Sequence, residues 1–153
     1  MSEHDPKHDL TEHDLKHISE RYFAEWEARD PDAIVALHSE DTKFQTHLGT
    51  EPVTGREAVR GTFAGFFEQF PQFGFDTHRV LYGDGFWVLD WKLTFVPEGE
   101  TERRGFDCLD VVNVDADGLV ARKETFIDMV QLQAALPDVD VEAELERGSE
   151  VAA

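Results

Sequence analysis

Apolar residues in the first half of the chain recur at the three- and four-residue spacing of amphipathic helices. The stripe from Leu15 to Trp26 is the clearest example. Thr11, Asp30 and Thr54 stand where side chains commonly cap the first turn of a helix. The pattern predicts three helices and one strand, namely helices over 12–29, 31–38 and 55–70 and a strand over 42–48.

From residue 74 onward the period shortens to two, which is the alternation of β-strands. Short connections rich in Gly, Asp and Pro interrupt the alternation, so the strands are expected to form an antiparallel meander. The expected strands span 74–82, 86–96, 103–114 and 119–129. Helices followed by a sheet define an α+β domain, in which a curved sheet around a helix encloses a Phe- and Trp-lined cone.

The two ends of the chain differ in composition from its middle. We expect one domain over 11–136, a disordered His- and Asp-rich arm over 1–10 and a disordered acidic tail over 137–153. His13 and His17 have the four-residue spacing of helical zinc ligands. An exposed, solvated His-rich face explains them more simply, and no metal site is expected.

The chain has 153 residues and a formal net charge of −19, which excludes the basic footprint needed for nucleic acid or an anionic membrane. Its single cysteine excludes an internal disulfide and favours an intracellular, cytoplasmic protein. No signal peptide or membrane-spanning run is visible in the sequence. The 12 phenylalanines are enough either to line a cavity or to fill it.

One carboxylate breaks the apolar face of a predicted strand. Phe106, Cys108, Asp110, Val112 and Val114 share one face, and only Asp110 is polar. Burying a carboxylate is costly unless it is paired, protonated or used. Asp110 therefore lies either inside a pocket, where it carries chemistry, or at a solvated rim of the sheet.

Several segments together resemble the NTF2-like (cystatin-like) superfamily, in particular its SnoaL-like polyketide cyclases and ketosteroid isomerases. The resemblance covers about 15–136 and implies the cone of three N-terminal helices on a curved antiparallel sheet. It rests on the sequences Arg21-Tyr22, Asp30-Pro31-Asp32-Ala33-Ile34-Val35-Ala36-Leu37, Gly49-Thr50-Glu51-Pro52-Val53-Thr54-Gly55 and Asp110-Val111-Val112.

The resemblance also implies roles for individual residues. Tyr22 corresponds to the tyrosine that donates to the substrate oxyanion, and Asp110 corresponds to the protonated aspartate beside it. Where the isomerases have their aspartate base, this chain has Thr46 followed by His47. Either His38, which titrates near neutrality in ordinary surroundings, or an ionised Asp110 would have to move the proton. A surface His38 that caps its helix is the alternative interpretation of that residue.

The leading hypothesis is a cofactor-independent isomerase or cyclase that acts on a small apolar carbonyl compound by proton transfer. The expected catalytic residues are Tyr22, Asp110 and His38. The resemblance implies a homodimer. The expected substrate-binding residues are Thr46, His47, Phe63, Trp87, Leu89, Trp91, Cys108 and Val112.

Two other functions remain open at this stage. One is a non-catalytic binding or interaction module that uses the same cone. The other is an epoxide-hydrolase-like enzyme, which needs an aspartate–arginine–aspartate set. The residue types for that set are present at Asp90, Arg103, Arg104, Asp107, Arg122 and Asp128. Asp90 and Asp107 are expected on the outward face of the sheet, where an ion-pair network or a dimer contact is simpler.

Overall fold

The computed structural model describes residues 10–145, so residues 1–9 and 146–153, including most of the predicted N-terminal arm, lie outside the described part. The elements follow one another as α1 (Glu12–Glu27), α2 (Pro31–Val35), β1 (His38–Thr46), β2 (Val53–Thr54), α3 (Arg56–Gln69), β3 (Gly74–Gly83), β4 (Phe86–Phe95), β5 (Arg104–Val114), β6 (Val120–Ile127) and α4 (Met129–Ala135).

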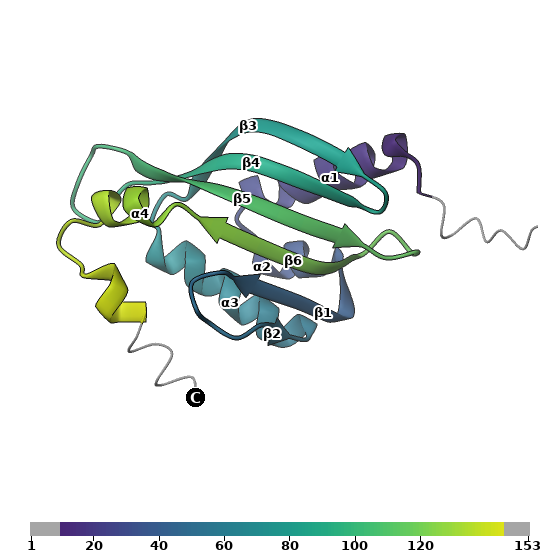
Figure 1. Ribbon diagram of the computed structural model, residues 1–153, viewed down its shortest axis with the longest axis horizontal. Coiled ribbons are helices and arrows are strands. Elements are labelled where there is room, and N and C mark those ends of the chain that lie inside the picture. The colour runs from purple at the N-terminus through teal and green to yellow at the C-terminus, as the bar shows by residue number, and fades with distance from the viewer. Residues whose placement is uncertain (1–9, 146–153) are drawn as a thin grey trace, which may run out of the picture.

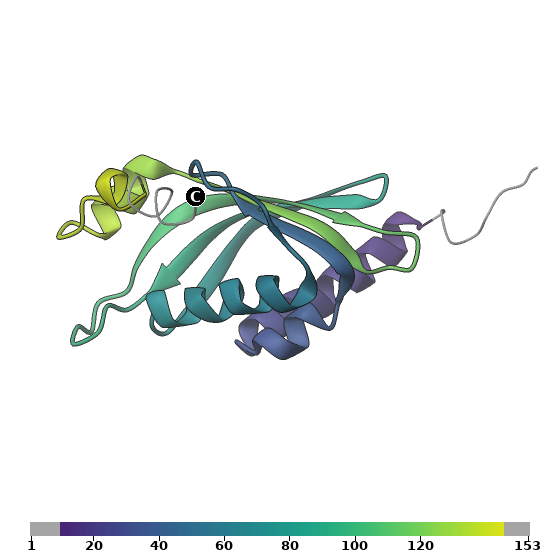
Figure 2. The same ribbon diagram turned by 90° about the horizontal axis from the view of Figure 1, so that it is seen from below.

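A single six-stranded sheet, ordered β2-β1-β6-β5-β4-β3, forms the body of the molecule (Figure 1). The sheet arches over α1, α2 and α3, which cover its concave side (Figure 2). This arrangement confirms the predicted α+β cone, with three N-terminal helices packed on a curved sheet. The meander from β3 to β6 is antiparallel as predicted, but β1 pairs with β6 in parallel.

The start of α1 matches the sequence prediction. The Thr11 hydroxyl accepts a hydrogen bond from the Asp14 backbone N–H, and the Asp14 carboxylate accepts one from the Thr11 N–H. Asp30 caps α2, because its carboxylate accepts from the backbone N–H groups of Asp32 and Ala33, and Pro31 lies in the first turn. The predicted cap of α3 differs, because Gly55 takes the N-cap position and no side chain caps this helix.

The second helix is shorter than predicted, and this difference places His38. It ends at Val35, and His38 begins β1 instead of ending a helix. The chain leaves the helix because the Leu37 carbonyl accepts a hydrogen bond from the Val120 N–H, which starts the parallel pairing of β1 with β6. The Arg56 guanidinium donates to the His38 carbonyl over 2.7 Å and fixes this corner.

The C-terminal part of the domain is more ordered than the sequence predicts. Asp128 follows the last strand and caps α4, and a further short helix spans 141–145. Val141 is only 5% exposed and packs into the core. The Gln133 side chain holds this segment, because its Oε1 accepts from the Val141 N–H and its Nε2 donates to the Val139 carbonyl. The segment over 137–145 therefore belongs to the domain.

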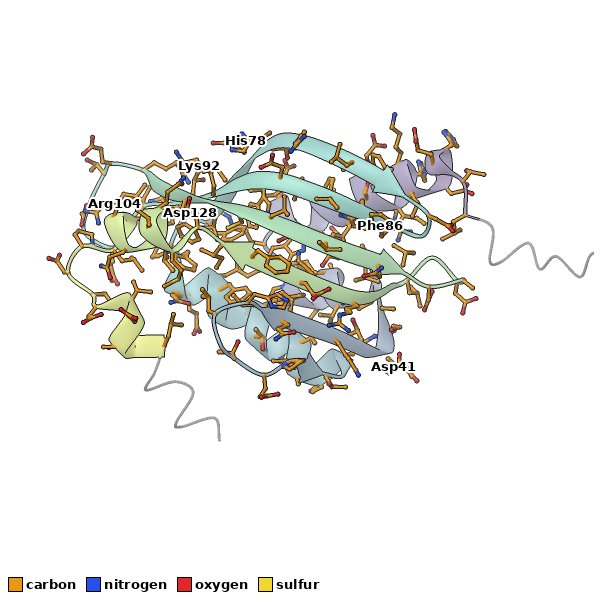
Figure 3. All side chains as sticks on the ribbon, viewed as in Figure 1. Asp41, His78, Phe86, Lys92, Arg104 and Asp128 are labelled. Atoms are coloured by element: carbon orange, nitrogen blue, oxygen red, sulfur yellow. The ribbon has the colours of Figure 1, made fainter. Side chains whose placement is uncertain are left out.

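Side chains at the end of the sheet near α4 hold that helix in place (Figure 3). Arg104, at the start of β5, donates to the carbonyl of Ala135, the last residue of α4, and pairs with Glu100. In the part of the chain that the structure describes, no helix has both the length and the apolar character needed to cross a membrane.

Candidate functional site

A cavity of about 880 Å³ lies between the concave face of the sheet and the helices. Cavities of this size hold drug-sized or steroid-sized molecules. Apolar side chains, many of them aromatic, form most of its wall, and the segment over 137–145 also contributes to it. The wall includes Phe23, Trp26, Phe44, Phe66, Phe70, Phe73, Phe75, Trp87, Trp91, Phe106, Val139, Val141 and Leu145.

Four polar side chains with mutual contacts also line this cavity, and we call them the polar cluster: Tyr22, Asp110, Lys123 and Thr125. The Lys123 ammonium lies 3.4 Å from the Tyr22 hydroxyl and 3.5 Å from Asp110 Oδ2. The Thr125 hydroxyl donates to Asp110 Oδ1 over 2.8 Å. Tyr22 comes from α1, Asp110 from β5, and Lys123 and Thr125 from β6. The structure thus brings Tyr22 and Asp110 together through a lysine that the sequence analysis did not select.

Lys123 is only 5% exposed. Its Nζ lies 4.2 Å from the Trp26 ring centroid, 5.0 Å from that of Tyr22 and 5.7 Å from that of Phe63. Burial by itself lowers the pKa of a lysine, but the oxygen atoms of Tyr22 and Asp110 reverse this and raise the pKa of Lys123. The side chain is therefore an ammonium ion, stabilised by a carboxylate and by aromatic faces.

Tyr22 remains a neutral phenol at ordinary pH. Burial raises the pKa of its hydroxyl, and the nearby Lys123 charge only partly opposes this effect. The hydroxyl oxygen also lies 2.9 Å from His38 Nε2. Tyr22 thus stands between a charged donor that faces the cavity and a histidine behind it.

His38 lies behind Tyr22 and is not among the residues that line the cavity. Its side chain is fully buried, and Nδ1 contacts the Thr42 hydroxyl over 2.8 Å. Burial, together with the positive charges of Lys123 and Arg56, lowers the pKa of His38 to about 3. A neutral imidazole with both nitrogens engaged suits the orientation of Tyr22 better than proton transfer to a substrate.

The depressed pKa of His38 predicts a pH dependence of stability. An unfolded histidine titrates near pH 6.5, so between about pH 6.5 and pH 3 the unfolded state binds a proton that the folded state does not. The stabilising contribution is present above pH 6.5 and is lost as the pH falls. We expect the free energy of unfolding to drop by about 2 kcal/mol from pH 7 to pH 5 through this group.

Urea unfolding of the wild type and of His38→Gln at both pH values measures this contribution, because Gln cannot titrate. His17→Gln, on the exposed face of α1, is the matched control and should retain the wild-type slope. Equal pH slopes for the wild type and His38→Gln would contradict the prediction.

Most of the substrate-binding residues expected from the sequence line the cavity. Thr46, Trp87, Leu89, Trp91, Cys108 and Val112 line it. Phe63 does not reach it and packs beneath the Lys123 ammonium. His47 also lies outside the lining, since it contacts Glu124 over 2.9 Å and stacks on Phe126. Burial raises the pKa of the Cys108 thiol, so this cysteine is an unreactive wall residue.

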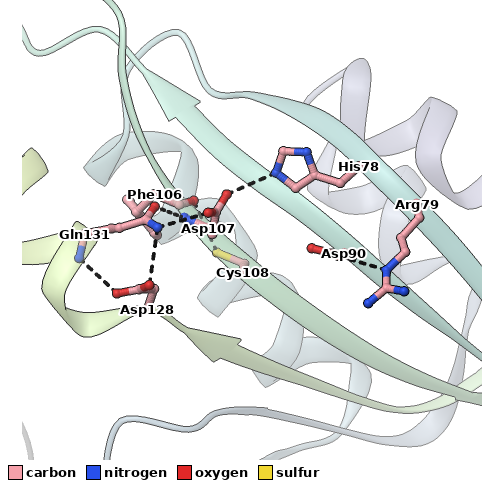
Figure 4. A network of polar contacts seen from close by, with 8 residues as sticks. All are labelled: His78, Arg79, Asp90, Phe106, Asp107, Cys108, Asp128 and Gln131. Carbon is pink, nitrogen blue, oxygen red and sulfur yellow. Dashed lines mark hydrogen bonds and ion pairs between the residues drawn. The ribbon is translucent and has the colours of Figure 1, made fainter.

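The acidic residues considered for an epoxide hydrolase lie elsewhere. Asp90 pairs with Arg79, and Asp107 separately contacts His78 and Gln131 (Figure 4). These groups are partly exposed, and Asp90 and Asp107 are absent from the cavity lining. Among the described residues, the charged side chains that line the cavity are Asp110, Lys123 and the exposed Glu51 and Glu144. Residues 10–145 as a whole contain no group of three or more His, Cys, Asp or Glu side chains placed to hold a metal ion.

A helix-backed curved sheet around such a cavity is the architecture of the NTF2-like cone. The model of the SnoaL-like domain family matches residues 19–123, which is more than half of the chain. The chain therefore belongs to the SnoaL-like family of the NTF2-like superfamily. No curated protein matches its sequence.

Solved structures with the same fold share little sequence with this chain. SalBIII, described as an epoxide hydrolase/cyclase-like enzyme in pyran ring formation of the polyether salinomycin, is 19% identical with a TM-score of 0.70. That match covers 80% of this chain and 96% of SalBIII. A hypothetical protein with a ketosteroid isomerase-like fold from Catenulispora acidiphila, in complex with trimethylamine, is 14% identical with a TM-score of 0.68, over 77% of this chain and 90% of that one.

A third similar structure is described as a SnoaL-like polyketide cyclase from Shewanella putrefaciens. It is 12% identical with a TM-score of 0.71, and the match covers 82% of this chain and 86% of that one. At such identities these likenesses define the fold, and the chemistry of this chain has to be argued from its own side chains.

Proposed function

We propose that this protein is a cofactor-independent isomerase or cyclase that moves a proton on an apolar, carbonyl-bearing substrate in the cavity. The observation that carries the proposal is the polar cluster, which combines a carboxylate, an ammonium ion and a phenol in a largely apolar chamber. Structural ion pairs are usually found at surfaces, whereas this one faces a space large enough for a ligand.

Each member of the cluster has a chemical role in the proposal. Asp110 Oδ1 accepts from Thr125, and Oδ2, which faces the Lys123 ammonium at 3.5 Å, takes a proton from a carbon beside the carbonyl. The Tyr22 hydroxyl donates to the carbonyl oxygen as negative charge develops there. The apolar wall excludes water, and this strengthens both interactions.

The donor role of Tyr22 sets the tautomer of His38. If the imidazole hydrogen is on Nε2, the ring donates to the Tyr22 oxygen, and Nδ1 accepts from the Thr42 hydroxyl. Tyr22 then accepts from His38 and Lys123 and keeps its own hydrogen for the substrate. In this arrangement His38 is a positioning residue that aims the phenol.

Replacing Tyr22 by Phe tests the function. We expect a panel of steroid-like and polyketide-like enones to contain at least one compound that the wild type converts. Tyr22→Phe should lower kcat/KM by about 10²-fold or more, because one donor to the oxyanion is lost. The matched control is Tyr82→Phe, since the Tyr82 hydroxyl bonds Ser19 and the residue does not line the cavity.

Two results would overturn this function. The first is that no enone of the panel is converted. The second is a conversion that Tyr22→Phe leaves unchanged. If the compounds bind without conversion, the protein is the non-catalytic binding module that the same cone could form.

We propose further that two copies associate through the outward face of the sheet. Leu81, Leu109 and Phe126 expose 47%, 36% and 41% of their surface there, and Leu109 and Phe126 lie side by side as register partners of β5 and β6. Light scattering would report the dimer, and a monomer at high protein concentration would contradict it.

A further inference from the structure

Lys123 makes its closest polar contacts with the two residues to which the proposed function gives chemical roles. The polar atoms of Tyr22 and Asp110 lie 3.4 and 3.5 Å from its Nζ, which are long separations for hydrogen bonds. An ammonium group has three N–H donors, and the described residues supply only these two oxygen partners. The cation is therefore loosely held beside the cavity, with hydrogen-bonding capacity left for a ligand.

The cavity wall also favours an acceptor-bearing ligand. The indole N–H groups of Trp87 and Trp91 are buried without a hydrogen-bond partner in the described structure, and both residues line the cavity. Buried donors are normally satisfied, so these two favour a ligand that brings oxygen atoms into the cavity.

We propose that Lys123 is a catalytic residue that keeps its positive charge and transfers its pairing from Asp110 to the oxygen of the substrate. This proposal rests on the proposed function. In the empty cavity Lys123 pairs with ionised Asp110. When Asp110 takes the proton, the C–H bond of the substrate breaks and its electron pair moves into the carbonyl. The resulting enolate oxygen is negative, Asp110 is neutral, and Lys123 pairs with the enolate.

This exchange leaves the net charge of the site unchanged. One ammonium and one carboxylate are present before the step, and one ammonium and one enolate are present after it. A net charge in a water-poor cavity is costly, so a step that only moves the negative charge by a few ångströms avoids a large penalty. The substrate class that follows is a ketone or enone with an acidic C–H bond and no charge of its own.

The other titratable groups that interact with Lys123 do not compete for this role. Tyr22 from α1 and Cys108 from β5 have raised pKa values and stay neutral. His38 from β1 has a depressed pKa of about 3 and also stays neutral. The described structure thus leaves Asp110 as the only anionic partner that Lys123 contacts directly.

Equilibrium binding of 4-nitrophenol tests the proposal without any turnover, because the phenol and its anion absorb at different wavelengths. The anion imitates an enolate oxygen. Below the pKa of the free phenol, we expect the wild type to bind it as the anion, with the phenol proton passing to Asp110. The heat of binding should then be the same in buffers of different ionisation enthalpy, because no proton reaches the solvent.

The variants separate Lys123 from Tyr22. Lys123→Met combined with Asp110→Asn keeps an uncharged pair of similar size and should bind the phenol only in its neutral form. Tyr22→Phe should still bind the anion, about tenfold more weakly, since the charge remains and one hydrogen bond is lost.

Several results would overturn the proposal. They are binding of the neutral phenol by the wild type, anion binding by the double variant, release of the proton to the buffer, and absence of binding by the wild type. Loss of anion binding in Tyr22→Phe alone would assign the charge stabilisation to the phenol. These outcomes are independent of the enone assay. The role of Lys123 can therefore be contradicted while the proposed function stands, and the proposed function can be contradicted while Lys123 is shown to bind the anion.

Discussion

Replacing Lys123 by Met is expected to lower the free energy of unfolding by about 3–5 kcal/mol, which is the usual cost of removing one partner from a buried ion pair. The main reason for this loss of stability is that the Asp110 carboxylate stays buried without its cation. Asp110 is 2% exposed and would keep a hydrogen bond only to Thr125 after the cation is gone. A Met side chain fills much of the same volume between Trp26 and Phe63, so the loss reports charge rather than packing.

The double variant Lys123→Met/Asp110→Asn provides the matched comparison. Removing both charges leaves neither ion unpaired, so most of the lost stability should return. Urea unfolding of the four proteins in this cycle gives the coupling energy between the two residues. A double variant as unstable as Lys123→Met would show that the lysine contributes through packing, and the electrostatic account of the pair would be wrong.

The elements that the sequence predicted well are those with an unambiguous period. The stripe of α1 and the alternation of β4 and β5 each place one apolar face toward a core, and the structure buries those faces. The same alternation put Asp110 on a buried face of β5, which is where it lies. Local periodicity is sufficient here because a strand or helix buries one face whatever its partners are.

The burial of Lys123 could not be predicted in this way, because polar and apolar residues do not alternate regularly along β6. Phe126 shares the outward face with Arg122 and Glu124, whereas Lys123 faces inward with Thr125 and Ile127. A large apolar residue stands on the polar face and a charged residue on the apolar one. Lys123 is buried against Asp110 and against aromatic rings from α1 and α3. Contacts with residues so distant in sequence cannot be predicted from the local pattern of polar and apolar positions.

The position of His38 was missed for a related reason. Its neighbours continue a helical pattern, but the chain turns into β1 because β6 offers backbone hydrogen bonds to it. This parallel pairing joins segments about 80 residues apart in sequence. The order of the segment over 137–145 likewise depends on the cavity edge and on Gln133, and its acidic composition does not reveal either contact.

Replacing Asp110 by Asn is expected to lower kcat by about 10²–10⁴-fold, the range for loss of a general base, if Asp110 Oδ2 accepts the substrate proton. Asn is nearly identical in shape and can still accept from Thr125, so the wall of the cavity should keep its form. The matched control is Asp107→Asn on the same strand, because Asp107 faces the outward network of His78 and Gln131 (Figure 4). That variant should retain full activity.

Stability and chemistry have to be separated in this test, because Asp110→Asn also leaves the Lys123 ammonium without its carboxylate. The double variant Lys123→Met/Asp110→Asn resolves them, since it is expected to fold nearly as stably as the wild type and yet to have no base. A stable but inactive double variant means that activity is lost through the missing catalytic groups, Asp110 and Lys123, and not through unfolding. Wild-type turnover by the double variant would remove Asp110 from the chemistry, and the proton would then have to be accepted by another group.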